Sequence, residues 1–306
     1  MSNVLEVNRL VKRYGDKIAL ENVTFSVKSG SCFGLLGPNG AGKSTTMKII
    51  TSIIEANEGT AAVFGKDIRK EADAIRRQVG YVPQDITLYE KLSARDNLTF
   101  FGELYGVRGK ELKTRIDEVL KQVGLSERGD DAISTFSGGM KRRINIAAAL
   151  LHKPKLVILD EPTVGIDPQS RNHIFQMIRE LKASGVSMIY STHYMEEVEA
   201  LCDDIAIIDH GKVIVQGSLD HLLGTYATQA IYMEAEGLTQ APALPGVNKA
   251  YADGKGWVLE CSNVLETMGG ASRILEERGL PVKSLEIMRP SLESVFLKLT
   301  GTTLRD

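Results

Sequence analysis

The sequence predicts an α/β fold built on a mostly parallel sheet, followed by a small α+β domain. Two observations predict the first part: a glycine-rich loop between an apolar strand and a helix, and short apolar runs that alternate with helical segments. A change near residue 220 in the pattern of expected strands and helices predicts the second part. The chain has 306 residues, 43% of them hydrophobic and 25% charged, which suggests two soluble globular domains.

Residues 1–220 are expected to form the first domain, and their strand and turn signals alternate around the glycine-rich loop. The expected strands are 4–10, 18–27, 32–36, 60–64, 156–159, 187–190 and 205–208. A helix is expected at about 43–54, and residues 86–152 carry the periodicity of a helical insert. Helical segments separate the later strands, and this strand–helix–strand pattern predicts mostly parallel pairing.

Residues 221–306 are expected to form the small α+β domain. Its expected elements are strands at about 230–235, 247–252 and 256–262, a helix at 264–278, a strand at 282–288 and a helix from Ser291. The last helix has a clear start, because Ser291 can cap its first turn and Glu293 lies within that turn.

Charge and cysteine content narrow the functional classes. The formal net charge is −2, so no nucleic-acid partner is expected. Cys32, Cys202 and Cys261 are far apart in sequence without metal-ligand or redox spacing, which predicts reduced packing thiols. We find neither a signal-peptide pattern nor an apolar run of the ~18 residues that span a membrane. A membrane role would therefore require a partner chain.

The glycine-rich loop matches the phosphate-loop pattern G-x-x-x-x-G-K-[ST]. Glycines permit the tight turn that points backbone N–H groups at a phosphate, and the helix that follows favours anions at its N-terminus. Lys43 supplies positive charge for the β- and γ-phosphates, and the Ser44 hydroxyl can ligate Mg²⁺. The expected nucleotide-binding residues are Gly37, Pro38, Asn39, Gly40, Ala41, Gly42, Lys43, Ser44 and Thr45.

Two acids, Asp160 and Glu161, follow the apolar run Leu156-Val-Ile-Leu159. At the carboxyl end of a strand Asp160 can hold Mg²⁺, and Glu161 is then placed to polarise a water beside the γ-phosphate. The alternative is a solvated turn with two acids. The apolar strand before them and Pro162 after them favour the site.

A second helix start suited to phosphate lies at Ser137-Gly138-Gly139, before a long helical run. Ser137 can cap this helix, and the glycines leave its N–H groups open to a phosphate. One nucleotide rarely needs both helix starts of one chain. We therefore infer that the second start serves a nucleotide bound to another subunit.

Because these motifs occur in this order, residues 4–218 resemble the ATP-binding-cassette (ABC) ATPases. The resemblance implies a phosphate-loop NTPase cassette with a RecA-like mixed sheet core and a helical subdomain at about 86–152. It implies ATP and Mg²⁺ as cofactors, with Ser44, Gln84 and Asp160 as the metal ligands. The segment Phe136-Ser-Gly-Gly-Met140 matches the family's signature motif, and it departs from the commonest form at Phe136 and Met140.

The resemblance also implies individual roles, and each has a plainer alternative. Tyr14 would stack on adenine, or be an exposed turn aromatic. Gln84 would be the Q-loop glutamine, or a loop amide. Asp167 would belong to the D-loop, or cap the helix that Pro168 opens, or do both. His193 would be the switch histidine, or a structural one. The basic run Lys141-Arg142-Arg143 is expected to be a solvated helix face rather than a nucleic-acid patch. Solvated helix surface is also expected for Glu196, Glu197 and Glu199.

The implied activity is ATP hydrolysis at an interface of two cassettes, in a homodimer or a heterodimer. The expected catalytic residues are Glu161, His193, Lys43 and Gln84, and Ser137, Gly138 and Gly139 would contact the nucleotide of the partner cassette. Residues 85–105 resemble the surface on which transport cassettes receive a transmembrane permease subunit. The expected location is therefore the cytoplasm, peripheral on the cytoplasmic face of the cell membrane.

The tail from Pro290 to Gly301 resembles the C-terminal extension of ABC-2-type exporter ATPases. Two other classes stay open. One is a soluble mechanochemical cassette of the DNA-repair or translation type, although coiled-coil arms, zinc modules and a second cassette are not visible. The other is a small-molecule phosphotransferase, which Ser137-Gly-Gly and His193 together disfavour. The small second domain either pairs the subunits or regulates turnover.

Overall fold

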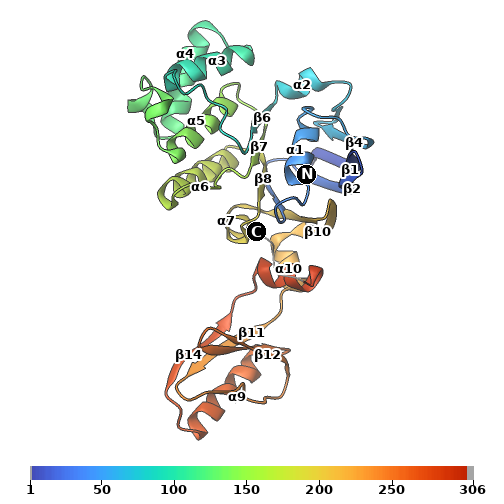
Figure 1. Cartoon of the computed structure of the whole chain (residues 1–306), viewed down its shortest axis with the longest axis vertical. Helices are drawn as coiled ribbons and strands as arrows, with labels where there is room; N and C mark the ends of the chain where they lie inside the picture. The colour runs from blue at the N-terminus through green and yellow to red at the C-terminus, as the bar shows by residue number, and fades with distance from the viewer. Residues whose placement is uncertain (1, 302–306) are drawn as a thin grey trace. The chain divides into compact units, whose positions relative to one another are not determined.

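The computed structural model describes residues 2–301 of the chain (Figure 1). These residues divide into two compact units, one ending at Leu219 and the other beginning at Asp220. The last five residues of the expected second domain, 302–306, lie outside the described residues. Within 2–301, none of the helices combines the length and the apolar character that a membrane crossing requires.

A six-stranded sheet forms the centre of the first unit, in the order β10-β9-β3-β8-β7-β6. Its strands are β3 (Cys32–Leu36), β6 (Val79–Val82), β7 (Leu156–Asp160), β8 (Ser187–Thr192), β9 (Asp204–Asp209) and β10 (Lys212–Ser218). All neighbours pair in parallel except β9 and β10. Strands β3, β7, β8 and β9 are buried along their whole length, as expected for a parallel sheet covered on both faces.

A second sheet of the first unit is antiparallel and has the order β2-β1-β4-β5. Its strands are β1 (Asn3–Tyr14), β2 (Lys17–Lys28), β4 (Glu58–Val63) and β5 (Lys66–Asp67). Helix α1 (Lys43–Ile50) shares one hydrophobic core with both sheets through Met47, Ile49 and Ile50. This core fixes the N-terminus of α1 beside the carboxyl ends of the central strands.

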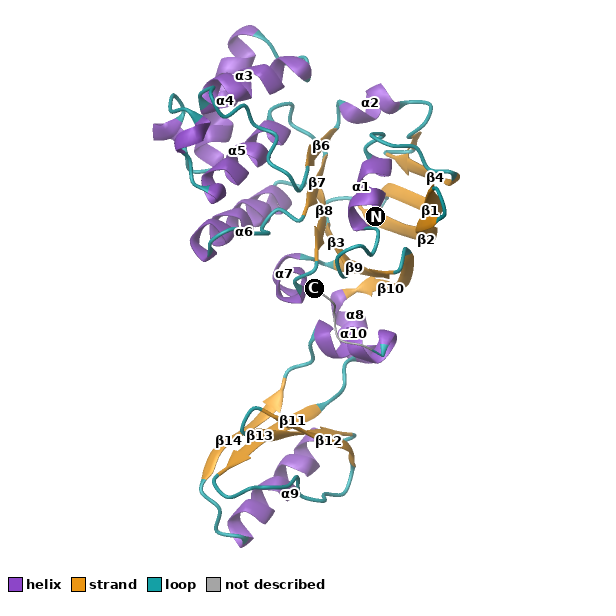
Figure 2. Cartoon of the chain, in the orientation of Figure 1, coloured by secondary structure: helices purple, strands orange, loops and turns teal. Residues whose placement is uncertain are grey.

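Figure 2 shows the remaining helices of the first unit around the central sheet. They are α2 (Ala72–Arg76), α3 (Ala94–Leu104), α4 (Gly109–Gln122), α5 (Gly138–Leu150), α6 (Pro168–Ala183) and α7 (Met195–Leu201). Helices α3, α4 and α5 form a group on the side of β6 and β7 opposite α1 (Figure 1). Helix α3 begins with a capping box, since Ser93 accepts from the Asp96 N–H and the Asp96 carboxylate accepts from the Ser93 N–H.

The second unit is a four-stranded antiparallel sheet, in the order β12-β13-β11-β14, with one helix packed on it. Its elements are α8 (Leu219–Tyr226), β11 (Ala230–Ala235), β12 (Val247–Asp253), β13 (Gly256–Cys261), α9 (Val264–Glu277), β14 (Val282–Met288) and α10 (Leu292–Thr300). Ile231 and Met233 from the sheet and Leu275 from α9 are fully or almost fully buried in its own core. Ser291 caps α10, as predicted, by accepting from the Ser294 N–H.

Two details differ from the sequence analysis. Strands β5, β6 and β10 and helices α2 and α8 were not predicted; β10 is an edge strand whose residues are exposed or half-buried, so it has no fully buried run. Cys32 and Cys202 are close in space although 170 residues separate them, with their sulfur atoms 3.8 Å apart. The cause is the parallel pairing of β3 and β9, because Cys202 lies two residues before β9.

Candidate functional site

The phosphate loop joins β3 to α1, and its glycines occupy positions where a side chain would clash. A Cβ at Gly37 would lie 2.1 Å from the carbonyl oxygen of Ile208, on the neighbouring strand. Gly42 has a φ of 110° and a Cβ there would lie 2.6 Å from Leu20. No side chain caps α1, so the N–H groups of its first turn are free to meet an anion.

The Lys43 side chain is buried, with 4% of its surface exposed. Its ammonium group donates to the carbonyl oxygens of Gly37 at 2.7 Å and Pro38 at 3.0 Å. It also forms an ion pair with Glu161 at 3.0 Å. A buried charge needs such partners, and here they hold the cation at the mouth of the phosphate loop.

The structure brings Ser44 and Asp160 together, as a Mg²⁺ site requires. The Ser44 hydroxyl donates to Asp160 Oδ1 at 3.1 Å, and the Ser191 hydroxyl donates to the same oxygen at 2.7 Å. Burial raises the pKa of Asp160. Hydroxyl and carboxylate oxygens are the ligands that Mg²⁺ prefers, and a buried carboxylate of raised pKa gains most from a cation. These residues therefore fit the metal.

Glu161 lies at the centre of the site and is 4% exposed. Besides Lys43 it contacts Gln84, whose Nε2 donates to Glu161 Oε2 at 3.3 Å. The Nδ1 of His193 lies 3.5 Å from the same oxygen and has no hydrogen-bond partner. The backbone of Glu161 is left-handed, with a φ of 46°, and its N–H donates to the carbonyl and hydroxyl oxygens of Ser191 at 3.1 Å each. The four expected catalytic residues are thus in contact.

The Gln84 loop is held by α5 through Arg142, contrary to the expectation of a solvated helix face. Arg142 is 4% exposed and donates to the carbonyl oxygens of Pro83, at 2.8 Å, and Gln84. Its neighbours also have partners: Arg143 donates to Val123 O and Lys141 pairs with Glu90. The prediction was wrong because Arg142 lies on the buried face of α5, although it belongs to a run of three basic residues.

The expectation of solvated acids on α7 was wrong for Glu197. Only 2% of this residue is exposed, and its carboxylate accepts hydrogen bonds from three hydroxyl groups. Glu196 and Glu199 are exposed as expected. The sequence contains a signal for the burial of Glu197, because Glu197, Val198 and Leu201 have the spacing that places them on one face of a helix, and this face is buried.

A pocket of about 250 Å³ opens beside the phosphate loop. The residues that line it are Tyr14, Lys17, Ala19, Asn39, Gly40, Gly42, Lys43, Ser44, Thr45, Gln84 and Glu161. Tyr14 is half exposed at its rim, with the Lys12 ammonium 5.1 Å from the ring centroid. An exposed aromatic ring next to a phosphate site is suited to stack on a base.

The signature segment is not part of this pocket, since Ser137, Gly138 and Gly139 are not among the lining residues. Ser137 caps α5 by accepting from the Met140 N–H at 3.2 Å. Gly138 faces open space, whereas a Cβ at Gly139 would lie 2.1 Å from the Ser170 hydroxyl. Asp167 caps α6 by accepting from the Ser170 N–H at 2.9 Å, so the capping role is present.

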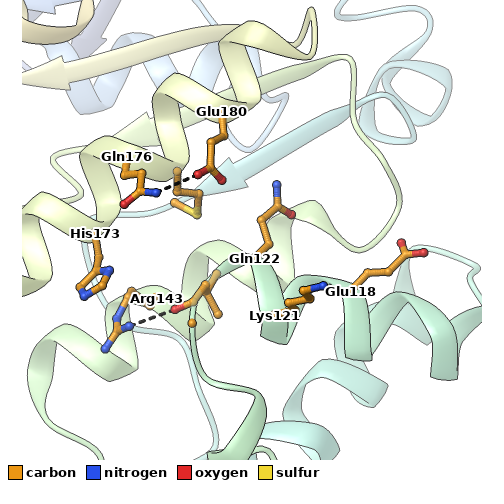
Figure 3. Close-up of a pocket in the computed structure, with 10 residues that line it drawn as sticks. Glu118, Lys121, Gln122, Arg143, His173, Gln176 and Glu180 are labelled. Atoms are coloured by element: carbon orange, nitrogen blue, oxygen red, sulfur yellow. Dashed lines mark hydrogen bonds between the residues drawn. The ribbon is translucent and has the colours of Figure 1, made fainter.

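A larger hollow of about 500 Å³ lies between α4, α5 and α6 (Figure 3). Its wall carries charges of both signs, from Lys121 and Arg143 and from Glu118 and Glu180. Gln176 and Glu180 are hydrogen-bonded to each other at 3.0 Å (Figure 3). None of the expected site residues lines this hollow, so volume alone does not mark the reactive centre.

Comparison with known proteins decides the family. The ABC transporter family profile matches residues 20–164. The linearmycin resistance ATP-binding protein LnrL of Bacillus subtilis (strain 168) is 44% identical, over 99% of this chain and 100% of that protein. The chain belongs to the ABC transporter family. The daunorubicin resistance ATP-binding protein DrrA3 of Streptomyces coeruleorubidus is 35% identical, over 98% of this chain and 97% of that protein.

Solved structures agree with this ABC assignment. The ATP-binding subunit of an ABC transporter has a TM-score of 0.67 at 34% identity, over 73% of this chain and 93% of that one. A dimeric ABC cassette in a post-hydrolysis state, bound to ADP and Pi, has a TM-score of 0.65 at 26% identity, over 70% of this chain and 98% of that one.

These findings confirm the predicted ABC fold and ATPase activity. The chain is an ATP-binding subunit of the ABC-2-type exporter group. The whole-length similarity to resistance ABC proteins favours transport over the soluble mechanochemical alternative.

Proposed function

We propose that this ABC ATPase acts as one of two paired cassettes and drives export through a separate permease at the cytoplasmic face of the cell membrane. The observation that carries the proposal is the division of the phosphate-binding groups. Lys43 and Glu161 line one pocket with the phosphate loop, while Ser137, Gly138 and Gly139 lie outside it. A second cassette would bring its signature segment to that pocket.

Within one cassette the residues have complementary tasks. The phosphate-loop N–H groups and Lys43 would hold the triphosphate, and Tyr14 would stack on the adenine ring. Ser44, Asp160 and Gln84 would hold Mg²⁺, which neutralises phosphate charge when bound. Glu161 would orient the attacking water, and His193 would contact the γ-phosphate. Fixed charges and dipoles of this kind supply the largest share of catalysis in most such sites.

Glu161 would be released from its own contacts when ATP binds. In the structure its carboxylate is paired with Lys43 and accepts from Gln84. A phosphate next to Lys43 competes for that ammonium group, because the phosphate carries more negative charge than a carboxylate. Glu161 is then free to accept a hydrogen bond from water. The same competition links nucleotide binding to the position of Gln84.

The paired arrangement is supported by the dimeric cassette among the similar structures. An exposed apolar group after Gln84 supports the permease contact. Its members are Ile86, Tyr89, Leu92, Phe100 and Leu104. Tyr89 and Phe100 pack edge to face, with their ring centroids 5.1 Å apart. Aromatic side chains gathered on one exposed surface are typical of protein contacts, and this group is next to the loop that Arg142 holds.

The substitution Glu161→Gln tests the proposal. It keeps the shape of the side chain but removes the base, so the variant should form a stable dimer with ATP and show little turnover. Light scattering with and without ATP measures the dimer, and phosphate release measures turnover. The same substitution at the exposed Glu196 of α7, Glu196→Gln, is the matched control. Turnover at the wild-type rate in Glu161→Gln would contradict the assigned base.

The permease contact needs its own test. Detergent extracts of membranes should yield a multispanning membrane protein together with this chain, and Tyr89→Asp should weaken that association. Co-purification with ribosomes or DNA instead would support the soluble mechanochemical alternative.

A further inference from the structure

A buried carboxylate on α7 is linked to the strand end that carries His193. Glu197 Oε2 accepts from the Thr192 hydroxyl at 2.8 Å and from the Tyr190 hydroxyl at 2.9 Å. Its Oε1 accepts from the Thr163 hydroxyl at 2.7 Å. The four side chains are all nine-tenths or more buried, so water does not replace these bonds.

The Thr192 hydroxyl connects Glu197 to the backbone on the far side of His193. It donates to Glu197 and at the same time accepts from the Tyr194 N–H at 3.0 Å. The residues directly before and after His193 are thus joined through one hydroxyl group. The Tyr194 ring also packs against the His193 ring, with the centroids 4.1 Å apart. This arrangement fixes the backbone from which the imidazole extends.

A position that is fixed in this way matters for His193, because the ring forms no hydrogen bond of its own at Nδ1. That nitrogen lies 3.5 Å from Glu161 Oε2 without forming a hydrogen bond to it. The ring orientation therefore depends on the backbone and on its contact with Tyr194. Displacement of a reacting group by about 1 Å can reduce a rate by up to 10²-fold.

We propose that Glu197 is a positioning residue for ATP hydrolysis and acts on His193 through the Thr192 hydroxyl. The inference rests on the proposed role of His193 in hydrolysis. Glu197 reaches neither the pocket nor the phosphate loop, so it would leave ATP binding unchanged. Its effect would fall on the rate of the chemical step.

The chain offers a matched pair of substitutions for the test. Thr192→Val and Tyr190→Phe are both nearly isosteric, and each removes one donor to the same carboxylate oxygen. Only Thr192 is bonded to the segment around His193. Thr192→Val should lower kcat about tenfold with little change in KM for ATP. Tyr190→Phe should keep kcat within about twofold of wild type, even where both variants lose similar thermal stability.

Two further variants complete the experiment. Thr192→Ser keeps the hydroxyl and should restore kcat, and Glu197→Gln should resemble Thr192→Val. Equal loss of kcat in Tyr190→Phe and Thr192→Val would show a purely structural carboxylate and overturn the inference. His193→Ala is the reference for the proposed function. Wild-type hydrolysis by His193→Ala would reject the role of His193 itself. Loss of hydrolysis in His193→Ala with full activity in Thr192→Val would reject only the role of Glu197.

Discussion

The N-termini of α1 and α5 are both open to phosphate, but their surroundings differ. Helix α1 begins with a glycine in a left-handed conformation, and a buried lysine lies in its first turn. Helix α5 begins with the exposed Ser137, whose hydroxyl caps the helix, and with Gly138 against open space. A buried cation accompanies the first helix start, whereas Ser137–Gly139 supplies only N–H groups and a hydroxyl.

This difference indicates a separate role in phosphate binding for each of the two helix starts. Lys43 and the phosphate loop can bind a triphosphate within one chain, because charge and donors are in one place. The start of α5 has a partial positive charge from its helix dipole, but its first three residues, Gly138, Gly139 and Met140, carry no charge. In the proposed pair of cassettes, it would add hydrogen-bond donors to a phosphate that the partner chain already holds. A helix start of this kind is suited to sense a nucleotide on a partner.

Lys43→Ala should have the largest effect, because it removes the buried cation that distinguishes the start of α1 from the start of α5. Hydrolysis should fall by about 10²–10³-fold, the loss seen when one preorganised electrostatic donor is removed. Glu161 would also lose its buried partner, so thermal stability should fall. Phosphate release and calorimetry measure the two effects. Lys48→Ala, exposed on the same helix, should change neither, and a comparable loss there would contradict the assignment.

Arg142→Met should show that the start of α5 depends on its link to the Gln84 loop. The variant leaves the carbonyl oxygens of Pro83 and Gln84 without their charged donor. We expect a loss of about 2 kcal/mol in the free energy of unfolding, the range for hydrogen bonds to charged groups. Urea unfolding measures it. Lys141→Met, on a half-buried neighbour, is the control. Equal stability of both variants would contradict a structural role for the arginine.

Gly138→Ala and Gly139→Ala should separate phosphate access from packing. The first adds a methyl group in open space, so the fold should be unchanged while hydrolysis falls about tenfold at a crowded shared site. The second places a methyl group on Ser170, and overpacking should cost about 1–3 kcal/mol of stability. Melting curves and ATPase rates distinguish them. Full activity in a stable Gly138→Ala protein would remove the phosphate role.

Asp160→Asn should give the smallest change in stability when Mg²⁺ is absent, and it tests the environment of the carboxylate that contacts Ser44 at the start of α1. Burial raises the pKa of Asp160, so the folded protein binds a proton more tightly there than the unfolded chain. The free energy of unfolding contributed by this group therefore falls as pH rises through the raised pKa. In Mg²⁺-free buffer at neutral pH, Asp160→Asn should melt a few degrees higher. The gain should disappear in acid, and the exposed Asp16→Asn should show none.

The sequence predicted the parts of the site that lie on continuous motifs. Lys43, Ser44, Asp160 and Glu161 each follow a buried parallel strand, and the carboxyl ends of neighbouring parallel strands lie at one edge of the sheet. The strands of the second unit were also predicted within about one residue, because turn signals separate them. Motif order and strand polarity together were sufficient for these elements.

The remaining residues depend on contacts between distant segments. Arg142 and Glu197 are charged residues on helices, and composition predicts that such residues are solvated. Their burial depends on carbonyl and hydroxyl groups from other elements, which local patterning does not reveal. Gly139 also has a packing reason to be glycine, because Ser170 fills its Cβ position, and its phosphate contact stays a prediction. Tertiary packing decided the burial of Arg142 and Glu197.

The left-handed backbone at Glu161 has a consequence for how this protein evolves. A side chain with a Cβ in that conformation costs roughly 1–2 kcal/mol, which glycine avoids and asparagine reduces. Gly or Asn would relieve that cost, but either would leave the buried Lys43 ammonium group without its carboxylate, which costs about 3–5 kcal/mol. Selection for heat resistance therefore favours Glu here, as the proposed role in turnover does. A drift library selected only for heat resistance should still retain Glu161, and frequent Gly or Asn in it would contradict the stabilising role of the ion pair.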